Sequence, residues 1–490
     1  MVKSLSEDYE FLKIYKEAVL DDLNIQENYQ VRNNRNPVIF VPGIGGTQLV
    51  SQNTDWSKFK ECSFYQKFDG TIWLGLNPNS GGTCNASIFK PAYDQTNNTV
   101  KTNSATTIKV NGKLGSFDSC NCFNDTAFCL AGLTEYAKKF KKALENVGYK
   151  EMEDLFAVGY DFRLVPHIGN YNLENFEDYG KEGNHFGRFF LNMKQIIDQA
   201  YLRNKKKVFL VCHSMGGLLT NVFLNVCRRV LGNKKLRFDN TDTTWNDWVD
   251  KCIGGFIPVA AAFDAGSKGL KAMLTGYDPG VNIGTNSYWR SVERTLMGNI
   301  LLIPMIKESY RDDTTLIINN VVEPQNDEYK KIDDIIGEYS SINKLLIEFG
   351  LTDVLNIYKN MLDIKLLALH DPKVDTYLVY SNGLDTEAGG YEYDKDEKGK
   401  INFDKLKAMY YTTGDGTVPE SIFKYLDDDH DYIIDSTFKN RNWYNNDSTN
   451  KLKIKRWSKI VEKRIFSSEH VELISKNTDV HNYIISKVSS

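Results

Sequence analysis

The stretch Val208–Gly217, VFLVCHSMGG, decides the fold of this chain. Its apolar run at 208–212 is typical of a buried strand, and the small and apolar residues at 216–219 are typical of the start of a helix. Ser214 stands between them, on a sharp turn that would expose its hydroxyl and aim the helix N-terminus at it. The usual pattern is G-x-S-x-G, and Cys212 replaces the first glycine. Ser214 is the candidate nucleophile.

The segments around this stretch alternate between helix-like spacing of apolar residues and short strand-like runs. Apolar residues at spacings of three and four predict amphipathic helices within 130–147 and 186–197. Short β-branched and aromatic runs predict strands at 38–41, 155–160, 252–262, 375–381 and 409–412. Helices that alternate with buried strands indicate an α/β fold, in which a mostly parallel sheet is covered on both faces.

The same alternation suggests how the chain is divided. Residues 1–36 are charged and are expected to form a peripheral extension. The core is expected at 37–269 and 373–490, and it includes a loop region at 45–129 for a lid or membrane contact. Residues 270–372 interrupt the alternation of strands and helices. An insertion at this place in the chain is expected to form a cap over a buried site.

Composition excludes some classes of function. The 60 basic and 64 acidic residues nearly cancel, and no long block of Lys and Arg occurs, so we expect no nucleic-acid partner. The longest apolar runs, 256–263 and 300–306, are far below the roughly 20 residues that a spanning helix needs.

Cysteines and glycosylation sequons suggest a secretory compartment. Five cysteines lie in polar, loop-like sequence, at 62, 84, 120, 122 and 129, while Cys212, Cys227 and Cys252 lie in apolar segments typical of buried thiols. Sequons occur in the same polar region at Asn85, Asn97 and Asn124, and again at Asn446. Disulfides and sequons together favour a secreted protein or one of a lysosomal or vacuolar lumen. The N-terminus shows no signal peptide, so a leader is expected to be missing from the chain.

A glycine-rich turn follows the first predicted strand. Pro42 and Gly43 end that strand, and Gly45 and Gly46 follow Ile44. A loop of this kind can present a backbone N–H, here that of Ile44, to a developing oxyanion. The alternatives are a simple tight turn or a phosphate loop, and no lysine follows the glycines as a phosphate loop requires.

One pair of cysteines flanks an aromatic loop, and three further cysteines follow it. Trp73 and Leu74 lie midway between Cys62 and Cys84. Such a loop, closed by one disulfide, suits a lid or a hook for a membrane surface, where an amphipathic Trp is favoured. An ordinary stapled loop with Trp73 in the core is an equal alternative. The next three cysteines, at 120, 122 and 129, leave one thiol over and fit no zinc pattern.

A serine nucleophile needs a histidine base and a carboxylate that orients the base, and in hydrolase chain order both follow the serine. Asp415 is the best acid, because it follows a predicted strand and is flanked by two glycines. Of the histidines beyond it, His430 lies in an acidic run and His481 near the terminal helix. His470 lies in a loop that opens a helix, as a base requires. The N–H of Met215 would join that of Ile44 in the oxyanion hole.

These residues resemble the lecithin:cholesterol acyltransferase family, which includes lysosomal phospholipases and phospholipid acyltransferases. The similar stretches, spread over residues 36–475, are NPVIFVPG at 36–43, WL at 73–74 between Cys62 and Cys84, YDFR at 160–163, HSMGG at 213–217, GDGTV at 414–418 and EHVE at 469–472. Departures are Phe162 where Trp is common, Ile44 at the oxyanion position, the absence of a cysteine after Cys252, and the long polar region from Cys84 to Cys129.

The resemblance implies an α/β-hydrolase with a Ser214–Asp415–His470 triad, a lid loop closed by Cys62 and Cys84, membrane contact at Trp73 and Leu74, and no cofactor or metal. It implies acyl transfer from a glycerophospholipid at a membrane or lipoprotein-like surface to water, a lipid alcohol or a sterol. The alternatives are a soluble esterase of the same fold and a catalytically silent lipid-binding or lipid-transfer protein. The sequence does not choose between water and an alcohol as acceptor.

Overall fold

The computed structural model describes residues 35–62, 69–73, 82–123, 135–264, 267–276, 286–303, 317–319, 346–347, 349–395, 398, 401–424, 426, 430–433, 451–454 and 456–489. Most of the expected N-terminal extension, Leu74, the cysteine at 129, and the sequons at 124 and 446 lie outside these residues.

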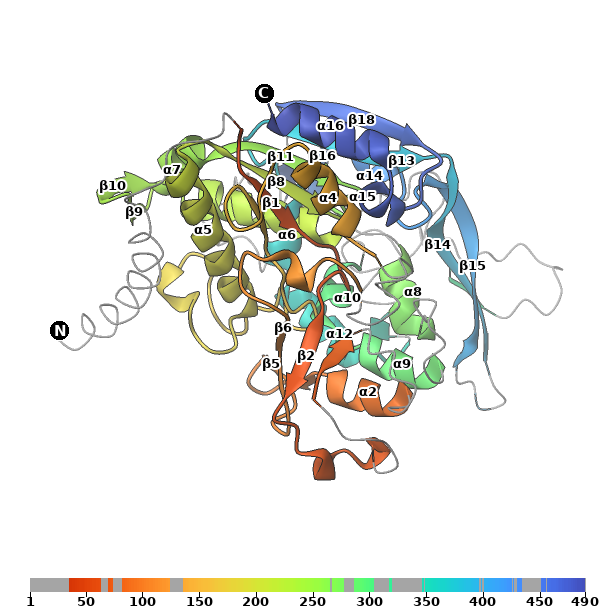
Figure 1. The fold of residues 1–490 in the computed structure, drawn as a ribbon. Helices are drawn as coiled ribbons and strands as arrows, with labels where there is room; N and C mark the ends of the chain where they lie inside the picture. The colour runs from red at the N-terminus through yellow and green to blue at the C-terminus, as the bar shows by residue number, and fades with distance from the viewer. Residues whose placement is uncertain are drawn as a thin grey trace.

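A six-stranded parallel sheet forms the centre of the molecule (Figure 1). Its strands have the order β18-β13-β11-β8-β1-β7, and each pairing between neighbours is parallel. The strands are β1 (Val38–Val41), β7 (Leu155–Ala157), β8 (Val208–His213), β11 (Ile253–Val259), β13 (Thr376–Asn382) and β18 (Ile460–Phe466). The parallel sheet that the sequence predicts is confirmed, and β8 lies inside it, so the turn after β8 falls at its carboxyl edge.

Helices cover both faces of the sheet, because alternate residues of each strand are buried in different apolar clusters. Phe40 and Val211 face the cluster that includes α4 (Lys138–Asn146), α15 (Glu472–Ser475) and α16 (Thr478–Val488). Val41 and Leu210 face the larger cluster that includes α5 (His185–Asn204), α6 (Met215–Asn225) and α7 (Trp245–Cys252). This two-sided burial explains why β1 and residues 208–212 of β8 are continuously apolar rather than alternating.

Smaller elements surround the carboxyl edge of the sheet. The expected cap segment contains α8 (Ser267–Thr275), α9 (Asn286–Glu293), α10 (Met297–Leu301), β12 (Ile317–Asn319), α12 (Thr352–Asn360) and α13 (Leu362–Leu369). The loop region contains β2 (Leu49–Gln52), β3 (Thr71–Trp73), α2 (Gly82–Phe89), β4 (Ala92–Asp94), β5 (Thr99–Lys101) and β6 (Thr107–Val110). That these two regions act as cap and lid stays a prediction.

Further described elements also lie outside the central sheet. They are the hairpin β9 (Lys235–Phe238) and β10 (Thr241–Thr244), the pair β16 (His430–Ile433) and β17 (Lys451–Ile454), and the short helix α14 (Ser421–Lys424). No described helix combines the length and the apolar character that crossing a bilayer requires.

The structure differs from the sequence-based prediction in three elements. The predicted strand at 409–412 belongs to β15 (Ile401–Gly414), which pairs with β14 (Leu384–Lys395) in a separate hairpin rather than in the central sheet. The central sheet ends instead with β18, which the sequence patterns do not predict. The helix predicted within 130–147 is α4, which begins only at Lys138, so Tyr136 lies before it, in a bend.

Candidate active site

Ser214 occupies the tight turn between β8 and α6. Its φ of 53° and ψ of −127° are unusual for a residue with a side chain, and such strain persists where the surroundings enforce it. The Ser214 N–H donates to the carbonyl of Val259 at 3.0 Å, which ties the turn to β11. Gly216 lies so close to the carbonyls of Val41 and Pro42 that no side chain would fit there. The sequence forms this turn because small residues let α6 approach β1.

His470 and Asp415 lie beside Ser214 in a continuous hydrogen-bonded chain. His470 Nε2 is 2.9 Å from Ser214 Oγ, and His470 Nδ1 is 2.7 Å from Asp415 Oδ2. His470 is 5% exposed and Asp415 is fully buried, so water competes little for either bond. The structure therefore brings together three residues that are up to 256 positions apart in the sequence.

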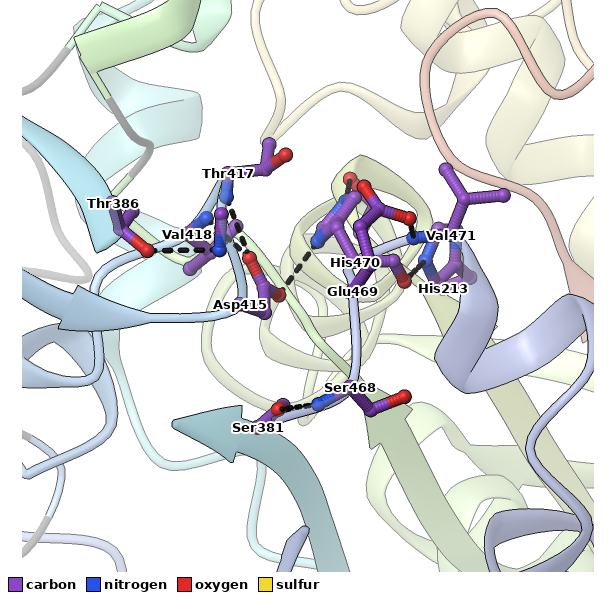
Figure 2. Close-up of polar contacts among 12 residues, drawn as sticks. His213, Ser381, Thr386, Asp415, Thr417, Val418, Ser468, Glu469, His470 and Val471 are labelled. Atoms are coloured by element: carbon purple, nitrogen blue, oxygen red, sulfur yellow. Dashed lines mark hydrogen bonds and ion pairs between the residues drawn. The ribbon is translucent and has the colours of Figure 1, made fainter. Parts of the chain in front are cut away.

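The turn after β15 fixes the carboxylate of Asp415. Its Oδ1 accepts hydrogen bonds from the N–H groups of Thr417 at 2.8 Å and Val418 at 2.6 Å, which leaves Oδ2 for the histidine (Figure 2). The N–H of Gly416, whose φ is +82°, donates to Thr386 Oγ1 at 2.8 Å. A glycine suits this left-handed conformation, which explains the Gly-Asp-Gly sequence at 414–416.

The loop after β18 fixes the histidine. The Ser468 N–H donates to Ser381 Oγ at 3.0 Å (Figure 2). The His470 N–H donates to the carbonyl of Asp415 at 3.0 Å. These two bonds join the loop to β13 and to the turn that carries the acid. The imidazole is thus positioned by its backbone as well as by its ring nitrogens.

Two aromatic side chains hold the glycine-rich turn after β1. Tyr160 donates its hydroxyl hydrogen to the carbonyl of Pro42 at 2.9 Å, and Trp73 Nε1–H donates to the carbonyl of Gly45 at 2.6 Å. Both carbonyls therefore have a hydrogen-bond donor. Between them, the N–H of Ile44 makes no hydrogen bond within the described part of the chain.

The N–H of Met215 is likewise without an acceptor among the described residues, because it begins α6 and has no preceding turn. Ile44 and Met215 belong to two segments that lie close together, because Gly216, next to Met215, contacts the carbonyl of Pro42, two residues before Ile44. Two unused donors at this place suit an oxyanion, although that role stays a prediction.

A second hydrogen-bonded chain connects the glycine-rich turn with the histidine loop. The Gly43 N–H donates to the hydroxyl oxygen of Tyr136 at 2.9 Å, and that hydroxyl lies 2.7 Å from His213 Nδ1. His213 Nε2 lies 3.0 Å from the carbonyl oxygen of His470, which can only accept. Nε2 therefore carries the hydrogen, and Tyr136 donates to Nδ1. Burial holds the pKa of His213 well below its usual range and raises that of Tyr136, which keeps both groups neutral.

A cavity of about 410 Å³ opens beside Ser214 and His470. Its apolar walls include Ile44, Trp73, Phe162, Leu296, Leu302 and Val418, and its polar lining includes Lys268, Glu293, Asn299, Thr417 and Glu469. A largely apolar cavity with a few polar groups is typical of a site for an apolar ligand. Among the described residues, no group of His, Cys, Asp or Glu side chains is arranged to hold a metal.

Trp73 is partly buried and lies in the wall of this cavity. Its ring packs against those of Phe89, Phe162 and Trp289, with centroids 5.1, 5.2 and 6.4 Å away. Trp73 thus packs against the core while it keeps part of its surface exposed. Membrane contact through Trp73 stays a prediction, and Leu74 lies outside the described residues.

The cysteines fall into two groups. Cys62 and Cys84 form a disulfide that closes the segment carrying Trp73, and Cys122 is also disulfide-bonded. Cys120 is the thiol left over, and it is buried rather than in an open loop as its polar sequence suggested. Cys212, Cys227 and Cys252 are buried free thiols, as the sequence predicts.

Glu293 is an ionisable group that the sequence does not single out. It ends α9, is 8% exposed, and accepts a hydrogen bond from Asn299 Nδ2. Burial raises the pKa of its carboxyl from 4.5 to about 8, and the bond from Asn299 opposes this shift only in part. At neutral pH the carboxyl is therefore largely protonated.

We expect Glu293→Gln to stabilise the protein more at pH 8 than at pH 5. Between about pH 4.5 and pH 8 the unfolded state loses this proton while the folded state keeps it, so wild-type stability falls as pH rises. Glutamine does not titrate, so the variant should gain roughly 2–4 kcal/mol over wild type across this window. Thermal and urea unfolding at both pH values measure the difference.

The control for this prediction is Glu153→Gln, because the Glu153 side chain is 41% exposed. Its stability relative to wild type should change little with pH. A Glu293→Gln difference that is the same at pH 5 and pH 8 would show that the buried carboxyl is ionised throughout.

The parallel sheet, the strained serine turn after a central strand, and the Ser-His-Asp chain at the carboxyl edge define an α/β-hydrolase. The family model described as lecithin:cholesterol acyltransferase matches residues 67–370. The chain belongs to this family. The match includes Ser214, whereas Ile44, Asp415 and His470 lie outside it.

Named relatives agree with this assignment. The chain is 25% identical over 393 residues to the phosphatidylcholine-sterol acyltransferase of Gallus gallus, covering 79% of this chain and 80% of the relative. It is 23% identical over 388 residues to the lysosomal phospholipase A and acyltransferase of Bos taurus, covering 78% and 80%. One solved structure, "The crystal structure of Tle4-Tli4 complex", is similar with a TM-score of 0.42 and 12% identity over 94% of this chain and 98% of that chain.

Sequence reasoning misses three contributors to the site. Tyr136 fits an apolar position on a helix face, and His213 is only a neighbour of the serine. Glu293 looks like one charged residue in an amphiphilic segment. Nothing local distinguishes these residues, because their roles come from hydrogen bonds across 77 positions for Tyr136 and from burial for Glu293.

Proposed function

We propose that this protein is a serine-dependent lipid acyl hydrolase or acyltransferase that acts on glycerophospholipid esters through an acyl-enzyme. The observation that carries the proposal is the buried chain from Ser214 Oγ through His470 to Asp415, at 2.9 and 2.7 Å, beside a largely apolar cavity. The family supports the lipid substrate, since named relatives are an acyltransferase for phosphatidylcholine and sterol and a phospholipase A.

In the first half of the proposed reaction, His470 Nε2 takes the hydroxyl proton of Ser214 while Oγ attacks the ester carbonyl. Asp415 holds the Nδ1–H tautomer and stabilises the imidazolium. The carbonyl oxygen becomes an oxyanion that the N–H groups of Ile44 and Met215 can stabilise. When the intermediate collapses, the alcohol of the lysophospholipid leaves with the proton from His470, and the acyl group remains on Ser214.

In the second half, water or a lipid alcohol takes the place of the lysophospholipid. His470 Nε2 removes its proton, its oxygen attacks the acyl-enzyme, and Ser214 Oγ leaves and is reprotonated. The products are a free fatty acid or a new ester. The choice depends on how well the cavity excludes water and holds an alcohol.

A phospholipid bilayer or lipoprotein-like surface is the proposed partner, since the substrate resides there. We also propose a secreted or lysosomal location. Its support is the disulfide between Cys62 and Cys84, the bonded state of Cys122, and the exposed sequon at Asn97 between β4 and β5. The bovine relative is a lysosomal protein by name.

Covalent labelling with a fluorophosphonate tests the nucleophile. We expect the intact protein to be labelled at Ser214 and Ser214→Ala to remain unlabelled, because the reagent requires an activated serine. Ser486→Ala removes a hydroxyl from the exposed face of α16 and should label like wild type. If the intact, folded protein takes no label, the proposal that it is an enzyme is overturned and a lipid-binding protein is favoured.

Mass spectrometry of the products then identifies the acceptor. Mixed phospholipid liposomes are incubated with the protein, with and without cholesterol or a diacylglycerol. Free fatty acid alone indicates a phospholipase, and a new sterol ester or triacylglycerol indicates an acyltransferase. Turnover of a soluble short-chain ester without any turnover of liposomes would indicate a soluble esterase instead.

A further inference from the structure

Glu293 and Asn299 form a polar pair in the lining of the cavity that contains Ser214. Glu293 ends α9 and Asn299 lies in α10, so the pair spans the short connection between these helices. Both side chains line the cavity, and both residues are more than nine-tenths buried. Their mutual bond, from Asn299 Nδ2 to Glu293 Oε2, is the one hydrogen bond that either side chain makes within the described residues.

A buried carboxyl without a cation is costly unless it is neutral or awaits a ligand. The two nearest arginines in the sequence have other contacts: Arg294 Nε donates to the carbonyl of Met273, and the guanidinium groups of Arg290 and Arg294 both lie over the ring of Phe403. Neither forms an ion pair with Glu293 among the described residues. The pair therefore offers its surroundings a neutral acid and an amide.

The hydrogen-bonding pattern of the pair indicates what it can bind. Because Glu293 Oε2 accepts from Asn299, the proton of the neutral carboxyl is available on the other oxygen as a donor. The amide oxygen of Asn299 provides an acceptor. A hydroxyl group is both donor and acceptor and satisfies both. An ester or phosphate oxygen can only accept, and a quaternary ammonium group does neither.

We propose that Glu293 and Asn299 form a subsite for a hydroxyl group of the lipid that accepts the acyl chain. This inference rests on the proposed function. The hydroxyl that attacks the acyl-enzyme must give its proton to His470 Nε2, so it cannot be the one held by Glu293. The acceptor that fits is a lipid with a second hydroxyl beside the reacting one, as in a monoacylglycerol. Its alkyl chain lies against apolar wall residues such as Leu296 and Leu302.

The test compares two acceptors of equal chain length, 1-monodecanoylglycerol and decan-1-ol, in transfer from phosphatidylcholine liposomes. Wild type should prefer the monoacylglycerol, and Glu293→Leu should reduce that preference about tenfold, since it removes the hydrogen bond that the Glu293 carboxyl donates to the second hydroxyl. Glu293→Gln keeps a donor and an acceptor and should retain most of the preference. Glu153→Leu, a substitution of an exposed glutamate, should behave as wild type.

A binding measurement separates this inference from the proposed function. In Ser214→Ala, which cannot form an acyl-enzyme, the affinities for the two lipids are measured by the fluorescence of the tryptophans, because Trp73 lines the cavity. The monoacylglycerol should bind about tenfold more tightly than decan-1-ol, and adding Glu293→Leu should remove the difference. If the double variant keeps the difference, or if Ser214→Ala shows none, the subsite is overturned even when the protein is an active acyl hydrolase. If the intact protein has no activity but the difference depends on Glu293, the proposed function fails and the subsite stands.

Discussion

Asp415→Asn is expected to lower kcat for ester hydrolysis by roughly 10³- to 10⁴-fold, while the fold is retained. Asparagine has the shape of aspartate, and its Oδ1 can still accept from the N–H groups of Thr417 and Val418. Its Nδ2, a donor, then faces His470 Nδ1, which must become an acceptor. The imidazole hydrogen moves to Nε2, the nitrogen that has to take the proton of Ser214.

Steady-state kinetics with a soluble short-chain ester measure this loss, and the rate of fluorophosphonate labelling measures it without turnover. Asp371→Asn is the matched control, because Asp371 is a buried acid that binds Lys373 and Ser458 before β13 and β18 begin, whereas the triad lies at the carboxyl ends of the strands. It should leave kcat close to that of wild type. An Asp415→Asn variant with more than a tenth of wild-type kcat would contradict the role of the carboxylate in fixing the tautomer.

Gly216→Ala is expected to destabilise the protein by several kcal/mol and to abolish labelling of Ser214. A Cβ at residue 216 would lie 2.5 Å from the carbonyl oxygen of Val41 and closer still to that of Pro42. Both are backbone atoms of β1 and the glycine-rich turn, so they cannot rotate away. In an unhindered helix the same change would be favourable by about 1 kcal/mol, which makes the steric origin of the loss easy to recognise.

Thermal unfolding and labelling rate are compared with those of Gly183→Ala. Gly183 has a φ of +85°, and no atom lies within 4 Å of the place that a Cβ would take, so alanine there should cost only the backbone strain, about 1 kcal/mol. If Gly216→Ala unfolds at the wild-type temperature and is labelled at the wild-type rate, the close approach of α6 to β1 is wrong.

The sequence predicts the elements whose signals are local. β1 and β8 are apolar runs that end at glycine-rich or small residues, and the structure places each within a residue or two of its predicted bounds. Ser214, Asp415 and His470 lie in turns with a distinct local chemistry, and the structure brings these three within hydrogen-bonding distance. Their catalytic roles remain predictions.

Elements that depend on tertiary context could not be predicted. β18 is an edge strand of the central sheet, and its exposed Glu462 and Arg464 hide the apolar pattern that identifies a buried strand. β15 has a strong strand sequence, but only its partner decides that it belongs to a hairpin outside the sheet. The apolar spacing that predicts a helix at Tyr136 is real, yet the helix starts two residues later.

The hairpin of β14 and β15 separates Asp415 from strand β13 in sequence, but Asp415 still lies close to the end of β13 in space. The chain leaves β13 at Asn382, and Leu384 is already paired with Gly414 on the return strand. Everything that fixes Asp415 lies at this closure or after it, including the bond from the Gly416 N–H to Thr386. The far end of the hairpin, where Lys395 pairs with Ile401, thus takes no part in fixing the acid, and sequence changes at that end should leave the position of Asp415 unaltered.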